Sequence, residues 1–538
     1  MIRAGAVEAA YRERLRRLEA EGFARRLWAR DVTLWADGPV PELADRLGWL
    51  DLPDAMLPGV GELERLAREI LDDGLDRVVL LGMGGSSLAP EVFARTLPGR
   101  DGFAALEVLD TTHPDAVGAV TERLDPGRTL FVVSSKSGGT VETLSLFRHF
   151  QAWLEGAVDD PGRHLVAITD PGSALEALGT ERRFRAVVTA PPDVGGRFSA
   201  LSVFGMVPAA LVGADLAALL GHARTAARRC RLPGEGNPGL ELGALLGEAA
   251  LEGRNKLTLL TSPGLAAFPA WLEQLLAEST GKDGKGIVPV PRETRLEPDA
   301  VGGDRLFAVF MLEGEEDRVP REAVEALADA GYPVVETVLG GPERLGAEMF
   351  RWEVATAVAG AILGVHPFDQ PDVQLAKELA KKALAGGLEA DVEGLAWDDG
   401  AVPGRIGALR AAADGGYLAV QAFLAPGPGT DAALEALERA LRGPGTFPVI
   451  TGYGPRFLHS TGQLHKGGPP EGVFLQLVDT PRGDVPIPGT DATFGRLIRA
   501  QADGDLAALA SRGRPVLRLE LGRDPDPAIR RLAAASQG

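Results

Sequence analysis

The stretch RVVLLGMGGSSL, residues 77–88, decides the fold class of this chain. Residues 77–81 are dominated by apolar side chains, as in a strand buried on both faces, and a glycine-rich turn follows them. Short apolar runs of the same kind recur downstream, with room for a helix between them, at residues 107–110, 129–134, 164–170 and 185–189. Buried strands that alternate with helices predict a parallel sheet covered by helices on both faces.

The same alternation continues through the rest of the chain. A second group of predicted strands and helices comprises residues 256–260, 305–310, 332–336, 346–363 and 373–385. A third group comprises residues 417–424, 448–452, 473–478, 494–511 and 515–521. Ahead of the first strand, residues 7–35 have the apolar spacing of an amphipathic helix.

The length predicts several domains, because the chain has 538 residues and one hydrophobic core stops growing at about 250–300 residues. We expect four parts: an N-terminal helical segment (1–66), two α/β sandwich domains (67–230 and 231–386) and a C-terminal α/β extension (387–538). The extension is expected to begin with a linker rich in glycine and acidic residues.

Composition narrows the class of protein. The chain has 56 basic and 75 acidic residues and a net charge of -19. This balance disfavours nucleic acid and anionic membrane surfaces as partners. Cys230 is the single cysteine, so an intramolecular disulfide and a multi-cysteine metal site are excluded. The N-terminus lacks the apolar stretch of a signal peptide, and no window reaches the ~18 apolar residues of a membrane span. We therefore expect a cytoplasmic protein.

Ligands of open parallel sheets bind beyond the carboxyl ends of the strands. The turn after the first strand contains Gly84, Gly85 and Ser86, where the backbone could approach a phosphate at the start of the next helix. The same residues could form a tight turn with no ligand. The spacing matches neither the dinucleotide fingerprint nor the Walker loop.

The third strand is followed by SSKSGGTVET, residues 134–143. Hydroxyl groups and backbone N–H groups at the start of a helix can form an anion cradle. A simple helix cap is the alternative, but a cap needs only one hydroxyl. We therefore predict phosphate binding by Ser135, Lys136, Ser137 and Thr140.

Three further motifs contain candidate catalytic residues. In GGRFS (195–199), Arg197 beside two glycines could approach a substrate oxygen or lie on the surface. In ESTGK (278–282), Glu278 closes an apolar helix, where burial would raise its pKa and suit it to act as a base; a solvated helix end is the alternative. In FDQPDVQLAK (368–377), Gln370 and Lys377 are predicted to share a face, although Lys377 could belong to a solvated lysine stripe.

The last candidate segment is HSTGQLHKGG, residues 459–468, which we expect to form a polar loop. It contains His459 and His465. No third ligand lies at the usual spacing for a metal, so acid–base chemistry is favoured over a metal site. We expect no metal and no cofactor.

Taken in this order, GMGGSS, SSKSGGTVET, GGRFS, ESTGK and FDQPDVQLAK resemble the phosphoglucose isomerase family. The resemblance covers residues 75–385. For the isomerase half of fused transaldolase–glucose-6-phosphate isomerases, which the chain resembles most, it extends to the C-terminus. The resemblance implies two sugar-isomerase (SIS-type) three-layer sandwich domains with parallel sheets, plus the C-terminal extension. It also implies cofactor-free interconversion of glucose 6-phosphate and fructose 6-phosphate through a cis-enediol.

The resemblance also implies roles for individual residues. Arg197 matches an arginine near the reacting carbons, Glu278 the catalytic base, and Gln370 and Lys377 two residues that complete the site. The family's phosphate pocket is matched by Ser86, Ser135, Lys136, Ser137 and Thr140.

The chain departs from the family in two places. Ser137 and Gly138 stand where the family usually has Thr and Phe, which keeps a hydroxyl. The family's Gly-Gln-His loop, with the ring-opening histidine that a partner subunit supplies, is missing between the glutamate and lysine motifs. The similar string TGQLH (461–465) makes His465 the predicted ring-opening residue, supplied within the same chain, and His459 could cap or orient the loop. The alternative is that both histidines are structural residues of the loop.

Two other functions stay open at this point. One is a dual phosphoglucose and phosphomannose isomerase. The other is a non-catalytic regulator that binds a sugar phosphate on the same fold, which would need no glutamate base. The expected ligand in every case is a small sugar phosphate, and the expected assembly is a monomer or a homodimer.

Overall fold

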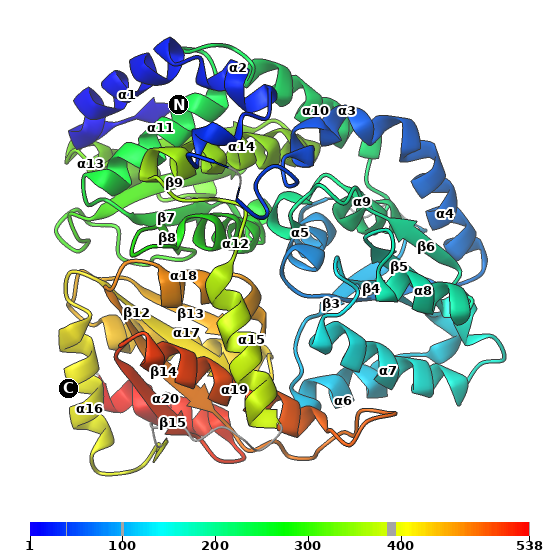
Figure 1. The fold of residues 1–538 in the computed structure, drawn as a ribbon. Coiled ribbons are helices and arrows are strands. Elements are labelled where there is room, and N and C mark those ends of the chain that lie inside the picture. The colour runs from blue at the N-terminus through cyan, green and yellow to red at the C-terminus, as the bar shows by residue number, and fades with distance from the viewer. Residues whose placement is uncertain (39, 98–101, 385–393, 537–538) are drawn as a thin grey trace.

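The computed structural model describes residues 1–38, 40–97, 102–384 and 394–536. Three five-stranded sheets organise this part of the chain (Figure 1). The first sheet has the order β3-β2-β4-β5-β6, and all its strands are parallel. Its strands are β2 (Arg77–Leu81), β3 (Ala105–Leu109), β4 (Thr129–Ser134), β5 (Leu165–Thr169) and β6 (Ala186–Thr189).

The second sheet has the order β1-β10-β9-β7-β8 and is parallel except for β1, which pairs antiparallel with β10. Its strands are β1 (Ile2–Arg3), β7 (Lys256–Thr261), β8 (Val288–Val290), β9 (Arg305–Leu312) and β10 (Val334–Leu339). The sequence did not predict β1 and β8, because two or three residues are too short to show a period.

The third sheet belongs to the C-terminal extension and is parallel, in the order β11-β15-β14-β12-β13. Its strands are β11 (Leu395–Ala396), β12 (Tyr417–Phe423), β13 (Val449–Tyr453), β14 (Gly472–Val478) and β15 (Val516–Glu520). The predicted linker 387–403 lies partly outside the described residues, and its described part already contains β11.

Helices cover both faces of the first sheet, as the sequence predicts. Along β2 and β4, alternate side chains enter two separate hydrophobic clusters: Val78 and Leu130 enter one, and Val79 and Phe131 the other. The helices of this region are α4 (Val60–Asp72), α5 (Leu88–Thr96), α6 (Pro114–Arg123), α7 (Val141–Glu155), α8 (Ala174–Glu181) and α9 (Val203–Leu211).

The helices around the second and third sheets complete the layers in Figure 1. Around the second sheet these are α10 (Leu216–Arg229), α11 (Pro238–Leu251), α12 (Phe268–Thr280), α13 (Arg321–Asp329) and α14 (Leu345–Leu363). Around the third they are α16 (Val402–Ala412), α17 (Pro428–Arg442), α18 (Gly462–Gly467), α19 (Phe494–Ser511) and α20 (Pro525–Ala535). Between them, α15 (Pro371–Leu384) leaves the second region and packs along α19.

Two sequence predictions need correction. The single helix expected over residues 7–35 is broken into α1 (Glu8–Ala20) and α2 (Phe23–Trp28), because Gly22 takes the left-handed conformation at φ 63°. The segment 459–468, expected to be a loop, contains the end of the 3-10 helix η12 (Arg456–His459) and the helix α18.

The domain boundaries drawn from the sequence stay a prediction. Within the described residues, no helix combines the length and the apolar character that crossing a membrane requires.

Candidate active site

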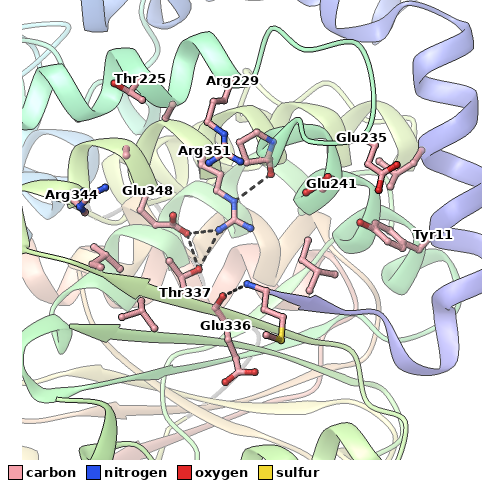
Figure 2. A pocket seen from close by; sticks show the side chains of 18 of the residues that line it. Tyr11, Thr225, Arg229, Glu235, Glu241, Glu336, Thr337, Arg344, Glu348 and Arg351 are labelled. Atoms are coloured by element: carbon pink, nitrogen blue, oxygen red, sulfur yellow. Dashed lines mark hydrogen bonds and ion pairs between the residues drawn. The ribbon is translucent and has the colours of Figure 1, made fainter. Parts of the chain in front are cut away.

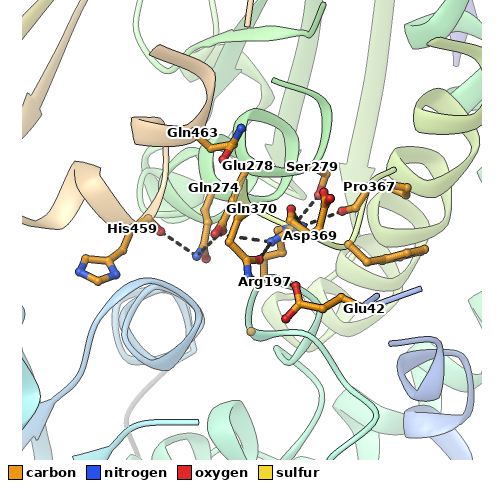
Figure 3. A network of polar contacts seen from close by, with 12 residues as sticks. Glu42, Arg197, Gln274, Glu278, Ser279, Pro367, Asp369, Gln370, His459 and Gln463 are labelled. Atoms are coloured by element: carbon orange, nitrogen blue, oxygen red, sulfur yellow. Dashed lines mark hydrogen bonds and ion pairs between the residues drawn. The ribbon is translucent and has the colours of Figure 1, made fainter. Parts of the chain in front are cut away.

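Segments from all three regions of the chain meet at the end of α12 (Figure 3). The first region contributes the 3-10 helices η5 (Gly84–Ser86) and η8 (Gly196–Phe198). The loop 367–370 follows α14, and η12 comes from the C-terminal extension. Several of the residues predicted from separate motifs therefore lie together in space.

Arg197 is the centre of this polar cluster. Its side chain is 3% exposed, and its guanidinium donates to Ser279 Oγ at 2.9 Å and to Gln370 Oε1 at 2.8 Å. It also donates to the carbonyl oxygens of Pro367 at 2.8 Å and Asp369 at 2.7 Å. These contacts fix a planar cation in a site with little access to water, where its field acts strongly on nearby charge.

Glu278 lies beside this cation, inside the last turns of α12. Its Oε1 is 3.5 Å from Arg197 Nη1, and its Oε2 accepts from Gln274 Nε2 at 3.1 Å. The same Gln274 amide donates to the carbonyl oxygen of His459 at 2.8 Å. Glu278 is thus buried, paired and oriented, and the alternative of a solvated charge at a helix end does not hold.

The glycine-rich turn after β2 has a clear packing role. Gly84 has φ 53°, and a Cβ there would lie 2.7 Å from Gln274 Nε2. A Cβ on Gly85 would overlap the carbonyl oxygen of Gly196. The two glycines therefore let η5 touch both α12 and η8, which brings Ser86 close to the segment that carries Arg197.

The predicted phosphate cradle lies at the carboxyl end of β4 and the start of α7. The hydroxyl groups of Ser135 and Thr140 are 3.0 Å apart, and Ser137 is exposed. Lys136 Nζ donates to Asp170 Oδ2 at 2.5 Å. Hydroxyl and N–H groups are therefore available to a phosphate at this helix start, whereas Lys136 is held by a carboxylate.

Gln370 and Lys377 occupy different places. Gln370 bridges Arg197 and Glu42, since its Nε2 donates to Glu42 Oε2 at 3.3 Å. Lys377 is exposed and lines a neighbouring cavity of about 500 Å³ together with Gln370 and Glu42. The structure thus joins Gln370 to the polar cluster and puts Lys377 at its border.

The side chain of His465 packs inside the C-terminal extension. The side chain is buried, its Nδ1 is 3.3 Å from Gln421 Nε2, and its ring packs against Tyr417, Phe457 and Phe474. Burial holds the pKa of His465 well below its usual value. The ring faces the C-terminal sheet, so the geometry does not support His465 as the residue that opens the sugar ring.

His459, by contrast, has a carboxylate as its partner. Its Nε2 is 3.1 Å from Glu142 Oε1, and Gln501 Nε2 donates to the same oxygen at 2.7 Å. Thr112 Oγ1 in turn donates to Gln501 Oε1 at 2.6 Å. Burial alone would raise the pKa of Glu142, but the His459 ring and its hydrogen bond hold that pKa below its usual value, and Lys377 adds to this effect.

Four residues of the site are not among those predicted from the sequence. Gln274 lies one turn before Glu278, and Glu142 lies inside the cradle motif, so helical spacing could have indicated both. Lys282 ends the ESTGK motif and pairs with Asp369 Oδ1 at 2.7 Å. Burial lowers the pKa of Lys282 to about 8, and the positive charge of Arg197 is the second-largest cause of this shift. Gln501 belongs to no motif, and only the tertiary fold brings it here.

A larger cavity lies elsewhere and contains none of the predicted site residues. Its volume is about 830 Å³, and it is bordered by α1, α10, α14 and β10. Figure 2 shows Arg351 among the side chains that line it; its Nη1 donates to Glu348 Oε1 at 3.0 Å and Thr337 Oγ1 at 3.2 Å. In the described part of the chain, no three His, Cys, Asp or Glu side chains are arranged to hold a metal ion.

Known proteins with similar sequences show the family of this chain. The family model for phosphoglucose isomerase matches residues 71–288. A glucose-6-phosphate isomerase of Rubrobacter xylanophilus is 32% identical over 418 residues, which cover 67% of this chain and 92% of that protein. The chain belongs to the phosphoglucose isomerase family. A second glucose-6-phosphate isomerase, from Thermus thermophilus, is 32% identical over 392 residues that cover 64% of this chain and 92% of that protein.

A solved structure of a hypothetical protein from Thermus thermophilus is also similar. It has 31% identity and a TM-score of 0.62, covering 72% of this chain and 100% of that chain. Membership of the phosphoglucose isomerase family confirms the predicted fold class, two SIS-type sandwiches with a C-terminal α/β extension. It also makes this chain an aldose–ketose isomerase.

Proposed function

We propose that this chain interconverts glucose 6-phosphate and fructose 6-phosphate through a cis-enediol, with Glu278 as the base. The observation that carries the proposal is the buried pair of Glu278 and Arg197, with 3.5 Å between their charged groups. A base that moves a proton between adjacent carbons needs a neighbouring cation, because the enediolate that forms is negatively charged. A sugar-phosphate-binding regulator would need no such pair.

The proposed chemistry uses only groups of this chain. The Ser135–Thr140 cradle and Ser86 hold the phosphate, and Gln370 keeps the Arg197 guanidinium in place. Glu278 removes the proton from C1 of the ketose and returns a proton to C2 of the aldose. Arg197 stabilises the charge on the enediolate oxygen between these two transfers.

Ring opening requires a second acid–base group, and we assign it to His459. The imidazole of His459 is hydrogen-bonded to Glu142, which keeps the ring oriented. The carbonyl oxygen of His459 accepts a hydrogen bond from Gln274, beside Glu278. An imidazole held by a carboxylate can donate a proton to the ring oxygen and regain it afterwards. All the groups proposed here lie in one chain.

The proposal is tested by supplying fructose 6-phosphate to the purified chain and measuring glucose 6-phosphate with an NADP-coupled dehydrogenase. We expect turnover without added metal or cofactor. Tight binding of fructose 6-phosphate with no product would contradict the proposal and support a regulator. Mannose 6-phosphate in the same assay shows whether the specificity is wider.

A further inference from the structure

A cavity of about 600 Å³ is lined by Pro269, Ala270 and Glu273 of α12, and neither Glu278 nor Arg197 lines it. It is bordered by the last residues of β7 and of β13, so it lies at the carboxyl ends of strands from two different sheets. Ligands of parallel sheets bind at such edges. Much of its wall is apolar and includes Leu260, Pro269, Leu296 and Phe457, which is the usual lining of a small-molecule site.

Four charged side chains line this cavity, and three of them have ion-pair partners. Arg292 pairs with Glu435 and, at 3.5 Å, with Glu438. Glu293 pairs with Arg442 and, at 2.9 Å, with Arg305. Arg456 pairs with Glu91 and, at 3.0 Å, with Asp110. Each of these three charges is therefore compensated by the protein itself.

Glu273 is the fourth, and it differs from the others. Within the described residues it has no cationic group within 4.0 Å, and its one hydrogen bond comes from Ser460 Oγ at 3.5 Å. Burial raises the pKa of Glu273 to about 7, although Arg456 and Ser460 act in the opposite direction. Arg456 is already shared by Glu91 and Asp110, so it cannot fully compensate a third carboxylate.

The carboxylates of Glu273 and Glu278 lie on different faces of α12. Glu273 and Glu278 are five residues apart, which separates them by about 140° around a helix of 3.6 residues per turn. Glu278 faces Arg197, whereas Glu273 faces Ser460 and the cavity. The cavity is thus a second space and not an extension of the proposed active site.

We propose that this cavity binds a small organic cation whose positive group pairs with Glu273 and whose flat apolar body packs against the apolar lining, which includes Leu296 and Phe457. An ammonium or amidinium group would supply the charge that the protein does not provide. The consequence for catalysis rests on the proposed function: an occupant contacts α12 and η12, which carry Glu278 and His459. The site is therefore placed to change turnover without touching the sugar phosphate.

The test is calorimetry on the full chain with benzamidine as the probe and benzamide as its neutral counterpart of the same shape. We expect one benzamidine per chain at pH 8 and at least ~10-fold weaker binding of benzamide. Between pH 8 and pH 6 benzamidine affinity should fall by about tenfold, because Glu273 becomes protonated while the amidinium stays charged. Saturating fructose 6-phosphate should leave the stoichiometry unchanged.

Two variants locate the site, with a third as control. Glu273→Gln should weaken benzamidine binding at least ~10-fold and remove its pH dependence. Ala270→Phe should fill the cavity from the same face of α12 and so weaken benzamidine binding. It tests the site if Glu273→Gln does not fold. Glu297→Gln changes an exposed carboxylate next to Leu296 and should have no effect.

Three results would overturn the proposal. The first is that benzamidine does not bind at millimolar concentration. The second is that benzamide binds as tightly as benzamidine. The third is that Glu273→Gln and Ala270→Phe both bind benzamidine as the unchanged protein does. Since these measurements do not use turnover, they fail independently of the proposed isomerase function. Loss of isomerase activity with intact benzamidine binding would count only against that function.

Discussion

At the scale of single residues, the site depends on how firmly two charged groups are held. Arg197 has four hydrogen-bond partners, and Glu278 has Gln274 and Arg197. Groups fixed in this way do not need to reorganise when charge develops on the substrate, and such preorganised electrostatic stabilisation is usually the largest single contribution to catalysis. Under the proposed function, Arg197 and Glu278 would act mainly through their fixed positions.

The first prediction separates the two histidines. His459→Ala should lower turnover of cyclic fructose 6-phosphate by about 10²-fold or more, the scale of losing an acid–base group. The same variant should keep turnover of 5-deoxyfructose 6-phosphate, which lacks the 5-hydroxyl and cannot close a ring. Steady-state kinetics on both substrates measures the difference.

His465→Leu is the matched comparison for this prediction. Because the His465 ring lies among aromatic side chains, its loss should alter stability but leave kcat of the folded protein within about twofold. Equal loss on both substrates in His459→Ala, or a large loss of kcat in His465→Leu, would reverse the assignment.

Sequence motifs located most of these residues but did not predict their pairing. The order of the motifs indicated Arg197, Glu278 and Gln370, which the structure brings together. The resemblance between TGQLH and the family loop pointed to His465, whereas His459 is the residue bonded to Glu142. A short sequence motif cannot show which side of α18 faces a sheet. The choice between His459 and His465 therefore depends on the packing of the folded chain.

At the scale of elements, the start of α7 is the proposed phosphate site. Substituting Ser135 and Thr140 together by Ala should weaken the binding of fructose 6-phosphate and of inorganic phosphate about tenfold or more, because two hydrogen bonds to a charged ligand are lost. Calorimetry with each ligand measures this.

The control for this double variant changes Thr180 and Thr225 to Ala, at exposed positions on α8 and α10. Phosphate affinity should then stay the same. If the Ser135 and Thr140 variant binds both ligands as the unchanged protein does, the phosphate lies elsewhere.

A second prediction at this scale concerns α14. Glu353 is fully buried there, and both its carboxyl oxygens lack a hydrogen-bond partner in the described structure. Burial raises the pKa of Glu353 well above its usual value. The folded state therefore keeps a proton that the unfolded state releases above about pH 4.3, so stability should fall by about 1.4 kcal/mol per pH unit above that point, until the folded pKa is reached.

Glu353→Gln removes this titration and keeps the shape of the side chain. Its Tm should exceed that of the unchanged protein by an increasing margin between pH 5 and pH 8, as measured by calorimetry. The substitution Glu62→Gln, at an exposed position of α4, should show no such trend. A Tm difference that does not vary with pH would show that Glu353 is ionised in the folded protein.

At the scale of the whole molecule, the C-terminal extension is joined to the other regions by extensive packing. Ile487, Phe494 and Leu497 of the extension enter the hydrophobic cluster on one face of the first sheet. Within the extension the sequence predicted β12 to β15 and α19, which begins and ends where expected, but it did not predict α16, α17, α18 or α20. It did not predict this docking, because an apolar helix face does not indicate which surface will cover it.

This arrangement predicts an active site complete within one chain. Specific activity should stay constant when the enzyme is diluted from micromolar to nanomolar concentration. Mixing Glu278→Gln with His459→Ala chains should restore no activity, whereas a site shared between two chains would recover part of it. Recovery after mixing, or loss on dilution, would favour a shared site.

Isomerisation of fructose 6-phosphate in deuterated water tests most directly whether Glu278 moves the proton between C1 and C2. Deuterium at C2 of the aldose product is measured by NMR. If Glu278 carries the proton, the unchanged protein should place solvent deuterium at C2. Glu278→Gln should lose both labelling and turnover by at least ~10²-fold while binding phosphate normally, and the exposed substitution Glu69→Gln should lose neither. Near-normal labelling at C2 by Glu278→Gln would contradict the account.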